Sequence, residues 1–319
     1  MKYTLSVIVG NYNQARYLPL TLDALFAQTR PADEIIVVDD ASTDNSVDII
    51  ESYLPHHPEA RLVRNPVNQG ANRNVNKFIE VAEGNIVYFA PSDDPIYPEF
   101  FERGMGLLEA HPEAALFSSR CNIIDADNND LGLFATPTPL TTPGYMDPAA
   151  CADALMREDS WFMGVLTLFR RDFLVEVGGF PEELTSIADS FISRQLALQH
   201  GVCFSPEILG AWRRNYAGAS WSATFDYETA KNLTELGVKK MEEAGDIFPA
   251  DYPSRWRQRY LFSSRRLALV EARRKAAARG IPQWLVAALH EGVLSVGLLI
   301  IMRPWDVWPV LRRRLGRNP

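Results

Sequence analysis

The chain has 319 residues, of which 47% are hydrophobic and 23% are charged. A chain of this length and composition can bury a large core, which excludes disorder as its main state. The three cysteines are far apart and odd in number, so they indicate neither a disulfide framework nor a zinc site, and they favour a reducing compartment. The histidines form no pair at metal-ligand spacing, so we expect carboxylates to hold any metal.

The net charge of −8 is unevenly distributed along the chain. Residues 255–319 carry 14 basic and three acidic side chains, whereas residues 1–254 carry 18 basic and 37 acidic ones. A basic segment of this kind is typical of an appendage that meets an anionic surface, although a solvated helix face is an alternative.

The first 94 residues alternate between strand-like and helical patterns. The N-terminal apolar run is too short for a signal peptide and has no small-residue cleavage site, so we expect a first strand there. We predict strands at 5–9, 34–39, 61–64 and 85–90, and helices at 18–28, 47–53 and 71–82. This order predicts an α/β fold, with a mostly parallel sheet flanked by helices.

The pattern changes beyond this region. Residues 125–147 are rich in Asn, Asp, Thr and Pro, and we expect a long surface loop or lid. A strand within 162–169 and helices at 170–180 and 187–199 follow. After residue 225 the pattern is helical almost to the end, with a break at 280–282. We therefore predict an α/β domain over residues 1–224 and a helical C-terminal region over residues 225–319.

Acidic pairs follow two of the predicted strands. Asp39 and Asp40 can accept hydrogen bonds from a base or a ribose, or they can cap the next helix. Asp93 and Asp94 would repel each other unless a cation or hydrogen-bond donors compensate them. Mg²⁺ or Mn²⁺ is the natural partner, because these ions prefer oxygen ligands and let substrate phosphates complete the shell. The alternative is an Asp-rich turn before Pro95.

Five segments resemble, in order and spacing, the family 2 glycosyltransferases, which have the Rossmann-like GT-A fold. They are SVIVGNYNQARYL, DEIIVVDDASTDNS, NQGANRNVN, AEGNIVYFAPSDD and VEVGGFPEE, and the resemblance covers about residues 4–222. It implies inverting, metal-dependent transfer of a sugar from a nucleotide-diphosphate sugar, of UDP or dTDP type, to the hydroxyl of a glycan or lipid-linked acceptor. Bacterial-type surface polysaccharide or glycolipid assembly is the implied setting, and we expect no nucleic acid as a partner.

The resemblance also implies roles for acidic residues. It makes Asp40 the nucleobase ligand and Asp94 the metal ligand, with Asp93 near the ribose and the metal; the family's D-x-D is S-D-D here. It makes Asp189 the base that deprotonates the acceptor, a task suited to a carboxylate whose pKa is raised. Ala188 replaces the first acidic residue of the family's pair. The alternative for Asp189 is the N-cap of the following helix.

Further nucleotide contacts are implied in three segments. Tyr12 and Asn13 occupy the first loop, although Gly10-Asn11 replaces the proline-threonine that usually precedes them. Arg73 matches a basic position that faces the nucleotide, where a guanidinium can offset phosphate charge; a surface-helix arginine is the alternative. The segment AWRRNYAGASWS resembles the one that closes over the diphosphate, which makes Arg213 or Arg214 a diphosphate ligand. The Q-x-x-R-W motif of processive members is absent, which favours a single transfer per encounter.

Other classes of protein explain the sequence less well. A catalytically silent sugar-nucleotide-binding module or membrane scaffold is suggested by Ala188, by Asn215 in place of the family's histidine, and by the altered first loop. A nucleotidyltransferase would need a glycine-rich loop after the first strand, where Gly10 stands alone. A dehydrogenase would need G-x-G-x-x-G after a strand.

The C-terminal tail has the composition of a membrane anchor. Residues 284–302 are long enough to cross a bilayer, but His290 and Glu291 within them make crossing costly. Trp305 and Trp308 near an arginine cluster are typical of an interface with anionic lipid. We expect a cytoplasmic protein that associates peripherally, through an in-plane or re-entrant helix, with the inner face of the cell membrane. A helix packed on the catalytic domain is the alternative.

Overall fold

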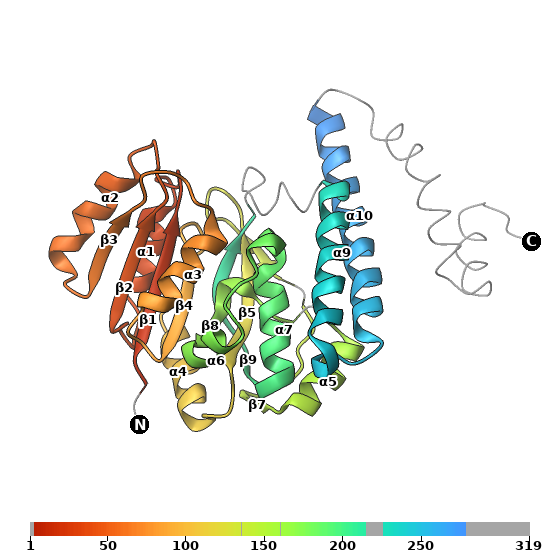
Figure 1. The fold of residues 1–319 in the computed structure, drawn as a ribbon. Helices are drawn as coiled ribbons and strands as arrows, with labels where there is room; N and C mark the ends of the chain where they lie inside the picture. Colours follow the sequence, from red (N-terminus) through yellow and green to blue (C-terminus); the bar gives the residue numbers. More distant parts are fainter. Residues whose placement is uncertain (1–2, 135, 160, 215–225, 279–319) are drawn as a thin grey trace, which may run out of the picture.

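The computed structural model describes residues 3–134, 136–159, 161–214 and 226–278 (Figure 1). Its first part contains the predicted alternation of strands and helices, each within about two residues of the expected bounds. The elements are β1 (Leu5–Asn11), α1 (Leu18–Phe26), β2 (Glu34–Asp39), α2 (Ser46–Tyr53), β3 (Ala60–Arg64), α3 (Ala71–Val81) and β4 (Ile86–Pro91).

The middle of the chain completes the sheet. Its elements are α4 (Phe100–Ala110), β5 (Leu116–Ile124), β6 (Asp130–Leu133), β7 (Gly144–Met146), α5 (Pro148–Arg157), β8 (Thr167–Arg170), α6 (Arg171–Glu176), α7 (Ala188–His200) and β9 (Val202–Arg213). The expectation of a loop over 125–147 was wrong in part, because β6 pairs with β5 and β7 pairs with β9. The predicted strand within 162–169 is shorter, since a 3₁₀ turn, η2 (Gly164–Leu166), precedes β8.

One mixed sheet runs through the described residues, in the order β3-β2-β1-β4-β8-β5-β9-β7, with β6 beside β5. Strands β1 to β4 pair in parallel, as do β5 and β9. Strand β8 is antiparallel to both of its neighbours. The predicted α/β fold, with a largely parallel sheet between helices, is confirmed.

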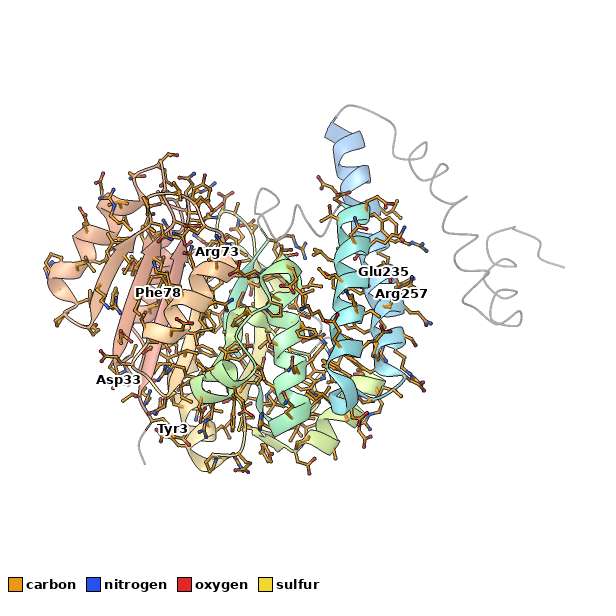
Figure 2. The ribbon with its side chains drawn as sticks, viewed as in Figure 1. Tyr3, Asp33, Arg73, Phe78, Glu235 and Arg257 are labelled. Carbon is orange, nitrogen blue, oxygen red and sulfur yellow. The ribbon has the colours of Figure 1, made fainter. Side chains whose placement is uncertain are left out.

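The sheet is buried on both faces, as the continuous apolar runs of β1 and β2 require. On one face Val7 packs in a cluster with Leu22 of α1 and Phe101 of α4. On the other face Ile8 packs against Phe78 of α3, which points toward the sheet in Figure 2. Helices on both faces therefore fix the strand ends, where polar side chains collect.

The C-terminal helices α9 (Tyr227–Glu243) and α10 (Tyr252–Ala278) lie side by side next to α7 (Figure 1). Their cluster includes Met241 and Trp256, which pack with Phe191 of α7. Gly237 permits the approach, because a Cβ there would lie 2.9 Å from the Trp256 ring. No helix within the described ranges has an apolar stretch long enough to cross a membrane. The predicted break at 280–282 and the tail at 284–317 lie outside those ranges.

Candidate functional site

The carboxyl ends of β1, β2 and β4 meet at one edge of the sheet. Their parallel register places Asn11 beside Asp39 and Gly10 beside Pro91. Figure 2 shows Arg73 toward this edge and Asp33, which precedes β2, at the opposite one. The polar loops that follow the three strands are therefore neighbours, as predicted for ligand binding in a parallel α/β sheet.

Asp40 is a buried carboxylate held by backbone and side-chain donors, which include the side chain of Asn74. Its Oδ1 accepts hydrogen bonds from Asn65 Nδ2 and from the backbone N–H of Gln69, and its Oδ2 accepts one from the N–H of Gly70, each at 2.9 Å. Burial raises the pKa of Asp40, but these hydrogen bonds outweigh it and hold the pKa below its ordinary value. Asp40 therefore presents a fixed, ionised carboxylate at the edge.

The first loop is fastened to the loop after β2. Asn13 adopts a left-handed conformation (φ 53°), and its Oδ1 accepts hydrogen bonds from the backbone N–H groups of Thr43 (2.7 Å) and Asp44 (3.3 Å). Asp39 accepts from Asn11 Nδ2 (2.9 Å), so it braces the same turn. Tyr12 is 47% exposed and stays accessible to a ligand.

Asp93 and Asp94 follow β4 in a turn where the positive charge of Arg213 does not offset the cost of ionising both carboxylates. The Oδ1 of Asp94 accepts a hydrogen bond from the N–H of Arg213 at 2.6 Å. Burial, and then the charge of Asp93, raise the pKa of Asp94 well above its ordinary value. Burial also raises the pKa of Asp93, and the charge of Arg213 opposes that rise. Such a pair fits a hard divalent cation, which would stabilise both ionised carboxylates.

Within the part of the chain that the structure describes, no three His, Cys, Asp or Glu side chains converge on a metal position. A cation at Asp94 would therefore take further ligands from Asp93, water or substrate phosphates, as Mg²⁺ commonly does.

Arg213 points into the protein. It is 2% exposed, its Nε donates to the carbonyl of Asp93 (2.8 Å), and its Nη1 donates to the carbonyl of Asp125 (2.7 Å). Its guanidinium lies 4.4 Å from the centre of the Tyr17 ring. It thus ties the turn after β4 to the β5–β6 hairpin and the first loop. Arg214 is half-buried, and residues 215–225 lie outside the described ranges.

Arg73 lies in the first turn of α3 and is exposed. Its Nε and Nη2 are each 3.3 Å from an oxygen of Glu182, in the segment that precedes α7. An ion pair this exposed stabilises little, so Arg73 can exchange its partner for a phosphate at small cost.

Asp189 lies in the first turn of α7. The N-cap of that helix is Ile187, so the alternative of Asp189 as the N-cap was wrong. Its side chain is accessible to solvent. Protein atoms nevertheless crowd the carboxylate, and this desolvation raises the pKa of Asp189, against the N–H of Ser190 and the charge of Arg194. A methyl group on Gly164 would stand 2.2 Å from Oδ2, so only glycine leaves room for the carboxylate there.

Asp189 is linked to the strand that carries the acidic pair. Gly164 is followed by Val165, whose carbonyl accepts a hydrogen bond from the hydroxyl of Tyr88 on β4 at 2.9 Å. The candidate base therefore stands against a backbone turn that is fixed to β4.

Sequence reasoning missed a buried network behind Asp189. Arg194 Nε donates to Asp159 Oδ1 (2.8 Å) and to the Tyr252 hydroxyl (2.9 Å), and that hydroxyl donates to Asp159 Oδ1 (2.7 Å). Arg194 Nη1 also donates to the carbonyl of Ser190 (2.7 Å). The only sequence signal was a charged residue on the apolar side of a predicted helix.

The model of the family described as Glycosyl transferase family 2 matches residues 6–178, more than half of the chain. The chain belongs to glycosyl transferase family 2. This membership confirms the resemblance that the five sequence segments carry.

Curated relatives of this family 2 chain align over parts of their length. It is 39% identical over 118 residues to the uncharacterized glycosyltransferase YibD of Escherichia coli, which covers 37% of this chain and 33% of the relative. It is 24% identical over 217 residues to the amylovoran biosynthesis glycosyltransferase AmsE of Erwinia amylovora, covering 64% of this chain and 74% of the relative.

Two solved structures share the fold of this family 2 chain. The mannosyltransferase PcManGT of Pyrobaculum calidifontis, in complex with GDP-Man and Mn²⁺, superposes with a TM-score of 0.61 at 22% identity, over 98% of this chain and 85% of that one. TarS of S. aureus, residues 1–349 with UDP-GlcNAc, gives a TM-score of 0.61 at 20% identity, over 82% and 72%. At these identities the likeness shows the fold alone, and it confirms the predicted GT-A-like architecture.

Proposed function

We propose that this family 2 protein transfers a sugar from a nucleotide-diphosphate sugar to an acceptor hydroxyl with inversion. The observation that carries the proposal is the meeting of Asp40 and Asp94 at one sheet edge, with Asp189 placed against the turn that is fixed to β4. Sugar transfer needs a grip on the nucleotide, neutralisation of the departing diphosphate and a base for the acceptor.

Asp40 is the proposed nucleobase ligand. Protein hydrogen bonds hold Asp40 ionised at the sheet edge, and an ionised carboxylate is an acceptor that suits an imide N–H of uracil or thymine. We therefore propose a UDP- or dTDP-sugar as donor. The neighbour that holds UDP-GlcNAc supports this choice, whereas the one that holds GDP-Man adds guanine to the bases to be tested. Further proposed nucleotide ligands are Tyr12, Asn13, Arg73 and Asp93, with Arg214, rather than the inward-pointing Arg213, as the candidate for the diphosphate.

Asp94 is the proposed ligand of Mg²⁺ or Mn²⁺. When bound, such an ion would supply positive charge to the diphosphate leaving group. The protein's own contribution is to hold Asp94 in place, through the hydrogen bond from Arg213 N–H.

Asp189 is the proposed base. It takes the proton of the acceptor hydroxyl while the hydroxyl oxygen bonds to the anomeric carbon and the bond from that carbon to the diphosphate oxygen breaks. One displacement inverts the configuration and releases the nucleoside diphosphate. The raised pKa of Asp189 suits the role, because a base works best when its pKa approaches the working pH.

The proposed setting is bacterial surface polysaccharide or glycolipid assembly on the inner face of the cell membrane. The relative AmsE, by its name a glycosyltransferase of amylovoran biosynthesis in a bacterium, supports this setting. The acceptor is then a glycan or a lipid-linked sugar, and the arginines at 312–314 and 317 are the ones proposed to meet anionic lipid.

One observation favours the second candidate, a module that binds a sugar nucleotide without turnover. Ala188 is fully buried where the family has the first acidic residue of its pair, so this chain offers a single carboxylate at that point. Turnover of any sugar nucleotide excludes this candidate.

A screen of UDP-, dTDP- and GDP-sugars for thermal stabilisation, with and without Mn²⁺, tests the proposed function, since a ligand that binds the native state raises the melting temperature. Asp94→Asn should lose the Mn²⁺-dependent part of the stabilisation, and Asp40→Ala should lose stabilisation in both conditions. Asp127→Asn, an exposed carboxylate paired with Arg16, is the matched control. Absence of stabilisation by every sugar nucleotide would contradict the proposal.

A further inference from the structure

Helix α3 is hydrogen-bonded on one side to the surroundings of Asp40. The loop that enters the helix supplies the N–H groups of Gln69 and Gly70 to that carboxylate. Inside the helix, Asn74 is 6% exposed, and its Oδ1 accepts a hydrogen bond from Asn65 Nδ2 at 2.7 Å. Asn65 donates to Asp40 as well. Hydrogen bonds therefore join the first turn of α3 to Asp40, the proposed nucleobase ligand.

The same helix holds the segment that leads to Asp189. Asn76 binds the backbone of Phe180 twice, as donor to its carbonyl and as acceptor from its N–H, each at 2.8 Å. Asn72 Nδ2 donates to the carbonyl of Thr185 at 2.9 Å. Asn72 and Asn76, one turn apart on α3, thus hold the two ends of the segment 180–185 by hydrogen bonds.

Thr185 has a backbone conformation that needs such support. Its φ of 42° and ψ of −112° lie outside the regions open to a β-branched residue. A strained residue persists only where the surroundings hold it. After Ser186, Ile187 and Ala188 are buried, so the turn at Thr185 determines where α7 begins and where Asp189 points.

We propose that Asn72 is a positioning residue, which holds Thr185 in its strained conformation and thereby places the carboxylate of Asp189. Helix α3 then positions both Asp40, the proposed nucleobase ligand, and Asp189, the proposed general base. This inference rests on the proposed role of Asp189, but the stabilising effect of Asn72 on the segment around Thr185 can be measured without any substrate.

Two variants of Asn72 test the inference by kinetics. Asn72→Ala removes the hydrogen bond, and Asn72→Asp keeps the shape but replaces the donor with an acceptor that faces a carbonyl. We expect kcat to fall roughly 10- to 100-fold in both, as for a misplaced catalytic group. The KM for the sugar nucleotide should stay within about twofold, because no contact with the sugar nucleotide is lost. The control is Glu80→Ala, on the exposed side of the same helix. A kcat equal to that of the control would overturn the inference.

Thr185→Gly separates positioning from a general loss of structure. Glycine adopts positive φ without the steric cost that threonine bears, so the turn needs less support. In this background Asn72→Ala should lower kcat by a smaller factor than in the wild type, which is a coupling that independent sites do not show. Equal factors in the two backgrounds would count against the role assigned to Asn72.

Hydrogen exchange of the amides at 183–190 gives a readout independent of turnover. Without substrate, Asn72→Ala should raise exchange there by about tenfold or more relative to Glu80→Ala, because local opening costs less free energy. Unchanged exchange would overturn the inference. If the wild-type protein turns over no sugar nucleotide, the proposed function fails, and the exchange result still decides whether Asn72 holds this segment.

Discussion

Asp189 and Gly164 approach each other so closely that the glycine limits where the carboxylate can lie. The position that a methyl group would take on Gly164 is 2.2 Å from Oδ2 of Asp189. Because Oδ2 is the end of a side chain that can rotate, the carboxylate would turn away at little cost in folding free energy. The position of the proposed base is therefore more sensitive to a substitution at Gly164 than the fold is.

Gly164→Ala should reduce kcat by about tenfold or more, with the melting temperature nearly unchanged, because a displaced base loses its alignment with the acceptor. Gly106→Ala in α4 is a matched control, since a Cβ there meets no atom within 4 Å. Kinetics and thermal melting of the two variants test this expectation. Equal kcat values would show that Asp189 is not the group that Gly164 constrains.

Motifs located the acidic residues of the site but not the direction of the arginine side chains. Asp40 and Asp94 follow strands that their apolar runs already predicted, so their place at the sheet edge followed from the fold. Arg213 and Arg214 were equal candidates for the diphosphate. They differ in side-chain direction, because the alternation of side chains along β9 turns Arg213 inward. Strand β9 was not predicted, so the sequence did not show this difference.

At the scale of elements, the network of Arg194, Asp159 and Tyr252 joins α10 to α7. All three residues are buried. The hydroxyl of Tyr252 both receives a hydrogen bond from Arg194 and donates one to Asp159, so its loss leaves two buried groups with one partner fewer. Breaking one member of a buried charged network destabilises more than losing a surface contact.

Tyr252→Phe should lower the free energy of unfolding by about 1–3 kcal/mol. Tyr227→Phe, which removes an exposed hydroxyl bound to Arg265, should cost roughly 0.5 kcal/mol or less. Denaturant unfolding of both variants measures the difference. Similar small losses would mean that the network contributes little to holding α10 on the catalytic part of the chain.

Strands β5 and β9 show why sequence patterns predicted only β8 in the second half of the sheet. Their register is broken between Ser119 and Asn122, where the pairing with β9 shifts, so neither strand carries a clean alternation. Strand β7 has three residues and depends on its pairing with the start of β9. Long-range pairing, which local patterns do not record, defines these strands.

At the scale of the whole molecule, charge is separated between the acidic body and the basic residues after 254. Truncation after about residue 280 retains the described length of α10 (Tyr252–Ala278), together with every proposed site residue. It removes the apolar run 284–302 and the four arginines at 312–314 and 317, the two contributions proposed to bind the membrane.

The truncated protein should no longer bind anionic vesicles, while it keeps activity on a soluble acceptor. Replacing the four arginines should weaken binding to anionic vesicles and reduce its dependence on salt, with little change on neutral vesicles. Sedimentation with vesicles of both kinds measures these effects. If the full-length protein binds neither kind of vesicle, or if the truncated form unfolds, the membrane proposal fails and the tail is a structural part of the core.

The pH dependence of sugar transfer by the wild-type protein and by Asp189→Asn tests the central claim most directly. Desolvation raises the pKa of Asp189, so the wild-type rate should fall as the pH drops through a value above that of an ordinary aspartate, because the protonated group is no longer a base. Above that pH, Asp189→Asn should transfer at least about 10²-fold more slowly than the wild type, with unchanged affinity for the sugar nucleotide, and the difference should shrink at lower pH as Asp189 is protonated. A variant that retains both the wild-type rate and the same acidic limb would contradict the account.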